Sequence, residues 1–306
     1  MNGKMNSFER QYADSLKRVL DNGILCHNRT GIDTYTVQHQ DFIIEDIMNN
    51  FPRIKGKKVY PLMALKEILW MCHGRTDIKW LQDRGVTYWD EWAKADGTIG
   101  KSYGYQYRNF NGVDQLQKLI NDMIEYPESR RLILNLWNVN ELDEMALAPC
   151  VYDFNFNCFN TGDNHYDVNL HVHVRSNDAF LGVPYDFMYA AWFLHIICKY
   201  ISMYSQWRFN PKNIYYTADN YHIYENHIDQ VKEYLKNTEE NKDDILSIPI
   251  QLLGDCVLDT RIMGKMSFDE YLDKYEFVAT KNKIVKLVPV KDLTFEYGPI
   301  KAPVAV

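Results

Sequence analysis

The sequence predicts an α+β domain in which helices pack against antiparallel strands. A hairpin pattern lies at its centre, because Tyr152–Phe159 alternates apolar and polar residues and Val168–Val174 does so again after a turn at Asn160–Asn164. The nearly all-apolar stretch Val183–Ser205 has the length of a central buried helix. No internal repeat and no Pro- or Ser-rich linker interrupts the chain, so we expect a single domain over residues 1–306.

Segments before the hairpin carry helical and strand patterns in turn. Apolar spacing predicts an amphipathic helix at Ser7–Leu20 and further helices at Leu62–Cys72 and Ile78–Arg84. Thr34–Ile44 is rich in β-branched and aromatic residues, which predicts one or two strands, and another strand is expected at Leu132–Trp137.

Segments after the central helix complete the expected layers. Asn213–Thr217 predicts a strand, and Asp219–Lys236 predicts a helix that follows it. Asn237–Asp244 is highly charged and is expected on the surface.

Composition excludes several classes of protein. Hydrophobic residues make up 46% and charged residues 25% of the chain, which excludes a mainly disordered, collagen-like or coiled-coil architecture. The formal charge of −7 argues against a protein that coats nucleic acid, since such binding needs surplus Lys and Arg. A few converging arginines could still hold a small anion.

Cysteine spacing and hydropathy indicate a reduced compartment without a membrane span. The 6 Cys are dispersed with no C-x-x-C pair, so neither a zinc site nor a redox motif is indicated. The first twenty residues are too polar for a signal peptide, and Met188–Cys198 is too short to cross a bilayer. We therefore expect a cytoplasmic protein, in the host cytoplasm if a phage encodes it.

Some residues could carry chemistry, each with a structural alternative. Cys150 follows Pro149 at a strand start, where it is either a nucleophile or a small buried hydrophobe. Arg130-Arg131 either clamps a phosphate or lies in a solvated loop. The segment Arg175-Ser176-Asn177-Asp178 is either an anion site or a turn.

Carboxylate and imidazole groups raise two further candidates. Glu67 lies beside a buried helical stripe, as either an acid/base group or a rim charge. His222 and His227 are five residues apart, which fits one helix face poorly, so we expect no metal site.

Motifs along nearly the whole chain share one order with a known family. They are Arg29-Thr30-Gly31, Glu67-Ile68-Leu69-Trp70, Val86–Trp92, Tyr103-Gly104, Arg130-Arg131, Met145–Cys150, Arg175–Asp178, Phe180–Pro184, His222–Tyr224 and the end Ile300–Val306. In this order they resemble the thymidylate synthase family. Relative to shorter members, the chain carries an insertion at about 237–266.

The resemblance implies a fold and a reaction. The fold is an α+β layered domain with a large mixed sheet, paired through sheet faces into a homodimer. The reaction is one-carbon transfer from 5,10-methylenetetrahydrofolate to C5 of a pyrimidine deoxynucleotide monophosphate, without a metal, a nucleic acid or a membrane. Thiolate attack at C6 makes C5 nucleophilic.

The resemblance also implies roles for individual residues. Cys150 matches the nucleophile, Glu67 the carboxylate that organises proton transfer, and Tyr103 a catalytic-site tyrosine. Binding of the nucleotide phosphate and sugar falls to Arg29, Arg130, Arg131, Arg175, Ser176, His222 and Tyr224. The paired arginines Arg130 and Arg131 would reach the partner's site, and arginines near Cys150 would favour its thiolate. The folate-facing wall comprises Trp89, Trp92, Leu147, Asp178, Leu181, Gly182, Tyr185 and Ala305, the last in a tail that closes over the folate.

One departure from the family pattern bears on the substrate. Val151 and Val174 replace a common His and Gln, as they do in some true members. Asp186, however, stands where thymidylate synthases carry the Asn that reads uracil. A carboxylate accepts from N3–H but cannot donate to O4, whereas the amino group of cytosine could donate to it. We therefore expect dCMP as substrate, to be hydroxymethylated or methylated, with dUMP-to-dTMP conversion as the alternative. A third hypothesis, a binding module that has lost catalysis, is disfavoured by the retained Cys150 and Glu67.

Overall fold

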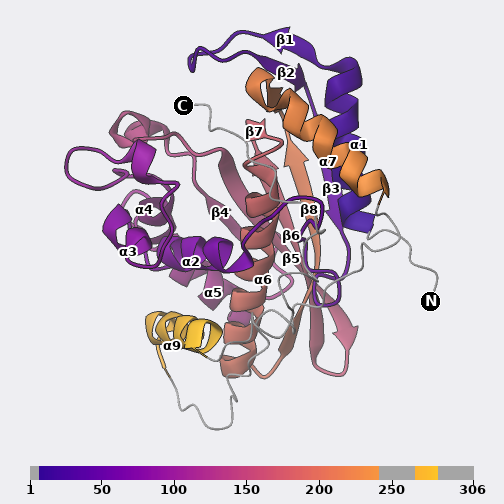
Figure 1. Cartoon of the computed structure of the whole chain (residues 1–306). Helices are drawn as coiled ribbons and strands as arrows, with labels where there is room; N and C mark the ends of the chain where they lie inside the picture. Colours follow the sequence, from indigo (N-terminus) through magenta and orange to yellow (C-terminus); the bar gives the residue numbers. More distant parts are fainter. Residues whose placement is uncertain (1–6, 241–265, 282–306) are drawn as a thin grey trace.

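Two β-sheets form the framework of the computed structural model, which describes residues 7–240 and 266–281 (Figure 1). One has five strands in the order β3-β8-β6-β5-β4, and the other has four in the order β1-β2-β9-β7. The strands are β1 Ile24–Cys26, β2 Thr34–Val37, β3 Gln40–Ile44, β4 Ile133–Asn135, β5 Val151–Gly162, β6 His165–Val174, β7 Asn177–Asp178, β8 Arg208–Ala218 and β9 Tyr221–Tyr224. The larger sheet is mixed, because β6 and β8 pair in parallel while the other neighbouring strands in that sheet pair antiparallel.

Helices surround this framework. The α-helices are α1 Ser7–Asn22, α2 Pro61–Cys72, α3 Ile78–Gln82, α4 Tyr103–Arg108, α5 Gln115–Glu125, α6 Val183–Tyr204, α7 Ile228–Glu240 and α9 Phe268–Lys281. Short 3₁₀ helices lie at η1 Asp90–Trp92, η2 Val139–Glu144 and η3 Glu225–His227. The mixed α+β architecture that the sequence predicts is confirmed.

The predicted hairpin and central helix organise the core. The β5–β6 turn is tighter than expected, since pairing continues to Gly162 and His165 around Asp163 and Asn164, which have φ of 48° and 60°. Positive φ at both turn residues matches the right-handed twist of the flanking strands. Helix α6 packs against α2 and the larger sheet (Figure 1). Its near-continuous burial explains the apolar sequence, because a helix covered on all sides needs no polar face.

The other face of the larger sheet is polar. On β5 and β6 the buried residues alternate with partly buried asparagines, aspartates and histidines. The His173 ring donates through Nδ1–H to Asp153 Oδ1 at 2.7 Å, and His171 stacks on Tyr215 with ring centroids 4.8 Å apart. This face therefore has ordered side chains with little apolar area.

Two expectations near the end of the chain are wrong. Residues from Tyr221 to Tyr224 form β9 rather than the start of a helix, because they pair with β2 and the first three of them are buried. Helix α7 begins only at Ile228 and continues to Glu240. The surface expectation fails at Asn237 and Thr238, which are buried, and holds at Glu239 and Glu240, which are exposed. Most of the insertion expected at 237–266 lies outside the described residues. In the two described stretches, no helix has the length and apolar character needed to cross a membrane.

Candidate active site

Cys150 is held by main-chain contacts on both sides. It stands directly before β5, and its backbone N–H donates to the Tyr103 hydroxyl at 2.8 Å. Its carbonyl oxygen accepts from the backbone N–H of Arg175 at 2.9 Å. Tyr103, the first residue of α4, thus connects the thiol segment to a helix that packs on α2.

The Arg175 guanidinium holds the two residues before Cys150. Its Nε donates to the Pro149 carbonyl at 2.8 Å and its Nη2 to the Ala148 carbonyl at 2.9 Å. Arg175 and Arg29 lower the pKa of the Cys150 thiol, as expected, but burial has the larger effect and raises that pKa to about 11. The arginines therefore favour the thiolate, as expected, but burial outweighs them.

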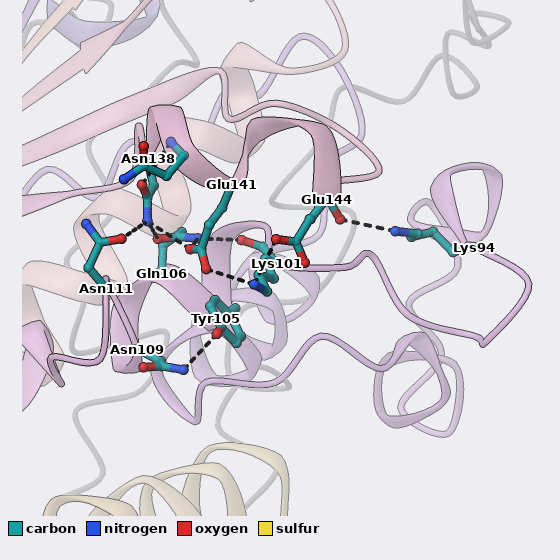
Figure 2. Close-up of polar contacts among 10 residues, drawn as sticks. Lys94, Lys101, Tyr105, Gln106, Asn109, Asn111, Asn138, Glu141 and Glu144 are labelled. Atoms are coloured by element: carbon teal, nitrogen blue, oxygen red, sulfur yellow. Dashed lines mark hydrogen bonds and ion pairs between the residues drawn. The ribbon is translucent and has the colours of Figure 1, made fainter.

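A polar network supports the segment that leads into Cys150 (Figure 2). Lys101 donates to Glu141 at 2.9 Å and to Glu144 at 2.8 Å. The other Glu141 oxygen accepts from Gln106 at 2.9 Å and from Asn138 at 2.8 Å. Lys101 and Gln106 flank Tyr103, while Glu141 and Glu144 lie just before Met145–Cys150. The network therefore connects the Tyr103 helix to the segment that carries Cys150.

Glu67 is a buried carboxylate on α2. One oxygen accepts from the Tyr88 hydroxyl at 2.7 Å and the other from the Trp89 indole N–H at 2.8 Å. Burial raises the pKa of Glu67 to about 7. The hydrogen bonds from Tyr88 and Trp89 act in the opposite direction, and the nearby Asp186 adds a smaller increase. A carboxyl group with this pKa can take or give a proton near neutral pH.

Asp186 lies in the first turn of α6, within electrostatic reach of Glu67 and Cys150. Its Oδ2 accepts from Asn177 Nδ2 at 2.8 Å and lies 3.0 Å from the Tyr216 hydroxyl. Burial raises the pKa of this carboxyl to about 6. The residue that breaks the family pattern is therefore part of the site.

Strands β7 and β9 bring further predicted residues to the same place. Asp178 pairs in register with His222, and its Oδ1 accepts from the backbone N–H groups of Phe180 and Leu181. The rings of His222 and Tyr224 meet edge to face at 5.2 Å. Burial lowers the pKa of His222, which favours its neutral form.

The predicted anion-binding residues are only partly gathered. Arg29, in the loop between β1 and β2, acts electrostatically on both Cys150 and Tyr224, and Arg175 is beside the thiol. Ser176 follows Arg175 directly and is partly buried. Arg130 and Arg131 are exposed before β4, and within the described residues neither side chain forms a hydrogen bond or an ion pair with the groups around Cys150.

Most of the predicted folate wall lies near Glu67. Ring contacts join Trp89 to Trp92 and to Tyr103, and Tyr88 to Tyr185. Leu147, Leu181 and Tyr185 are partly buried against the core, and Gly182 precedes α6. Trp89 is only 7% exposed and donates to Glu67, so it also supports that carboxylate. Ala305 lies outside the described residues.

The sequence motifs assigned no role to Tyr88 or Tyr216, and they placed Asn177 only in a candidate anion-binding segment. Tyr88 and Asn177 belong to segments already identified, so their position beside Trp89 and Asp178 could have revealed them. Tyr216 is one of several aromatic residues on β8, and nothing in its local pattern distinguishes it. His222 and His227 do not form a metal cluster, and the described stretches hold no group of three or more His, Cys, Asp or Glu suited to one.

Comparison with known proteins agrees with this arrangement. A family profile described as thymidylate synthase matches residues 10–261. A curated thymidylate synthase of Mycoplasma genitalium is 36% identical over 258 residues, which cover 75% of this chain and 86% of that protein. The chain is therefore an enzyme of the one-carbon transferase class. It belongs to the thymidylate synthase family, whose co-substrate is 5,10-methylenetetrahydrofolate.

Proposed function

We propose that this enzyme converts dUMP to dTMP. The observation that carries the proposal is the convergence of Cys150, Glu67 and Arg175 around one site, in a chain that is 36% identical to a protein named thymidylate synthase. The sequence alone favoured dCMP. The Mycoplasma genitalium relative is named thymidylate synthase, which supports the alternative, and we therefore propose dUMP rather than dCMP as the substrate.

The nucleotide is activated by the thiol. Cys150 Sγ attacks C6 of uracil after losing its proton, and the electron pair moves to C5, which becomes nucleophilic. Burial holds the pKa of Cys150 near 11, and Arg175 and Arg29 act in the opposite direction by stabilising the thiolate that attacks. Glu67, with a pKa of about 7, exchanges protons beside the base.

Binding of the phosphate and sugar follows from the charges. Arg29, Arg175 and Ser176 offer donors to the phosphate, and Arg130 and Arg131 do so from a partner subunit. His222 and Tyr224 hold the 3′-hydroxyl of the deoxyribose. The homodimer would join through the polar face of the larger sheet, whose partly buried Asn and His side chains offer hydrogen-bonding groups to a second copy.

The aromatic surface beside Glu67 suits a flat co-substrate. Trp92, Leu147, Leu181 and Tyr185 are apolar groups that are only partly buried, and Asp178 and Gly182 lie at the adjoining start of α6. When bound there, 5,10-methylenetetrahydrofolate supplies the one-carbon unit and the hydride of the methyl group. Trp89 and the tail residue Ala305 would help exclude water from the reaction.

A second candidate function rests on Asp186. A deoxycytidylate hydroxymethylase or methylase would use this carboxyl group to accept from the amino group of cytosine. Water in place of hydride would then give a hydroxymethyl product.

Product analysis separates the two functions. The purified protein is incubated with 5,10-methylenetetrahydrofolate and either dUMP or dCMP, and products are identified by mass. We expect dTMP from dUMP, with the near-ultraviolet absorbance rise that accompanies oxidation of the folate to dihydrofolate. Turnover of dCMP without turnover of dUMP would overturn the proposal, and Cys150→Ser provides the inactive control.

A further inference from the structure

Three side chains from three elements form a closed ring of polar contacts beside the thiol. Asn177 of β7 donates through Nδ2 to Asp186 Oδ2 at 2.8 Å. The Tyr216 hydroxyl of β8 lies 2.8 Å from Asn177 Oδ1 and 3.0 Å from Asp186 Oδ2. Asn177 is only 2% exposed and Tyr216 is fully buried, so water cannot replace these contacts.

Counting hydrogens distinguishes the two protonation states of this ring. Three contacts need three protons, but with an ionised Asp186 only the Asn177 amide and the Tyr216 hydroxyl can donate. The single Tyr216 proton would then serve two oxygens. With a proton on Asp186 Oδ2, each member donates once: Asn177 to Asp186, Asp186 to Tyr216, and Tyr216 to Asn177. Only the neutral carboxyl group satisfies every contact.

The charges around Asp186 act in the same direction. Asp178 on β7, Glu67 on α2 and the Cys150 thiol before β5 are the acidic groups facing it, with Tyr88, Tyr103 on α4 and Tyr189 on α6. In the described residues, no Lys or Arg side chain makes a hydrogen bond or an ion pair with Asp186. Burial, with a smaller contribution from Asp178, raises the pKa of Asp186 to about 6, whereas donation from Asn177 and Tyr216 to an ionised carboxylate acts in the opposite direction.

We propose that Asn177 and Tyr216 are positioning residues that hold a proton on Asp186 Oδ2, so that this enzyme reads uracil with a neutral carboxyl group. The proposal rests on the proposed dUMP function. Asp186 Oδ1, which forms no hydrogen bond within the described part of the chain, is then a neutral carbonyl oxygen. It accepts from N3–H of uracil without placing a negative charge beside O4.

The same ring disfavours cytosine. Unprotonated N3 of cytosine would face Oδ1, so two acceptors would meet, and an unsatisfied buried polar group costs roughly 1–3 kcal/mol in general. Breaking the ring frees the Asp186 proton, which can then donate to N3 while the carboxyl group accepts from the amino group. The ring thus lets an aspartate favour uracil over cytosine by accepting from N3–H without a negative charge beside O4.

The test measures kcat/KM for dUMP and for dCMP from pH 5 to pH 9. The wild type is compared with Tyr216→Phe, Asp186→Asn and the control Tyr221→Phe, which removes a buried hydroxyl bonded to Ser15 instead. Relative to Asp186→Asn, wild-type activity with dUMP should fall about tenfold per pH unit above pH 6. Tyr216→Phe should move that fall to lower pH and reduce the dUMP-to-dCMP selectivity about tenfold or more. Tyr221→Phe should match the wild-type profile.

Three results would overturn the inference. A parallel loss with both nucleotides and an unshifted pH profile would make Tyr216 merely structural. If Tyr216→Phe does not fold, the comparison of wild type with Asp186→Asn still decides, because identical pH profiles exclude a protonated Asp186. Wild-type turnover of dCMP but not of dUMP at every pH would overturn the proposed function as well. The first two results would overturn only the inference about Asp186, because the wild type would still convert dUMP.

Discussion

The surroundings of Cys150 and of Asp186 are built in different ways. Around Cys150 the contacts run through the main chain, from Tyr103 and Arg175 to atoms of residues 148–150. Around Asp186 they run between side chains of β7, β8 and α6. Contacts to main-chain atoms fix the position of the Cys150 thiol independently of the substrate. A ring of side chains can be altered by a single substitution, which could change the base that the site binds. If the proposed roles of Cys150 and Asp186 hold, chemistry and base selectivity depend on different parts of one site.

The largest effect is expected at the thiol itself. Cys150→Ser removes the nucleophile but none of the main-chain contacts, so kcat should fall by at least about 10⁴-fold while dUMP still binds. Turnover and dUMP affinity are measured together, with Cys26→Ser as a matched control at a partly exposed cysteine. Residual turnover within tenfold of wild type would exclude covalent catalysis by Cys150.

We expect the second-largest effect at Glu67, because this carboxylate interacts electrostatically both with Asp186 and with Tyr103 beside Cys150. Glu67→Gln keeps the side-chain shape but cannot exchange protons, so kcat should fall about 10²- to 10⁴-fold. Glu233→Gln, at an exposed position of α7, is the control. A change in KM alone would show that Glu67 only positions Tyr88 and Trp89.

The same carboxylate predicts a pH dependence of stability. The pKa of Glu67 is raised in the folded state to about 7, so the folded state binds its proton more tightly than the unfolded chain. This contribution is present at low pH and is lost as pH rises from about 4.5 to 7, by about 3 kcal/mol in the free energy of unfolding. Urea unfolding at several pH values should show a smaller decline in Glu67→Gln. Equal declines would mean that Glu67 is not buried as described.

Arg175 offers a test of the main-chain framework. Arg175→Lys keeps the charge but cannot hold the Ala148 and Pro149 carbonyls with a planar fork. The KM for dUMP should rise about 10- to 100-fold, the value of one or two charge-assisted hydrogen bonds. Arg208→Lys, at an exposed site of β8, is the control. An unchanged KM would assign the phosphate to other residues.

The smallest effect concerns the network before Cys150 (Figure 2). Glu141→Gln weakens contacts to Lys101, Gln106 and Asn138 and should lower the free energy of unfolding by about 1–2 kcal/mol. Glu144→Gln removes a contact to Lys101 alone at an exposed position and should cost below about 0.5 kcal/mol. Thermal unfolding of both variants checks the difference, and equal losses would show that the network is not cooperative.

Sequence patterns predicted the Cys150 region better than the Asp186 region. Strand alternation and the apolar run gave the β5–β6 hairpin and α6, because their periodicity reflects burial directly. Cys150, Arg175 and Tyr103 stand in motifs next to those elements. Tyr216 could not be predicted, since its role depends on where β8 lies relative to α6, which its own strand pattern does not encode.

The pKa of Cys150 could not be predicted for a similar reason. Nearby arginines are visible in the sequence, but the burial that outweighs them arises only when α6 and the sheets come together. The start of α7 was misplaced because Tyr221–Tyr224 is apolar enough for either structure, and pairing with β2 decided it.

Proton uptake on dUMP binding tests the neutral carboxyl group most directly. Calorimetric titration at pH 7.5 in buffers of different ionisation enthalpy measures the protons exchanged when the nucleotide binds. The wild type should take up close to one more proton than Asp186→Asn, because Asp186, with a pKa of about 6, must be reprotonated to read uracil. Equal proton exchange in the two proteins would contradict the account.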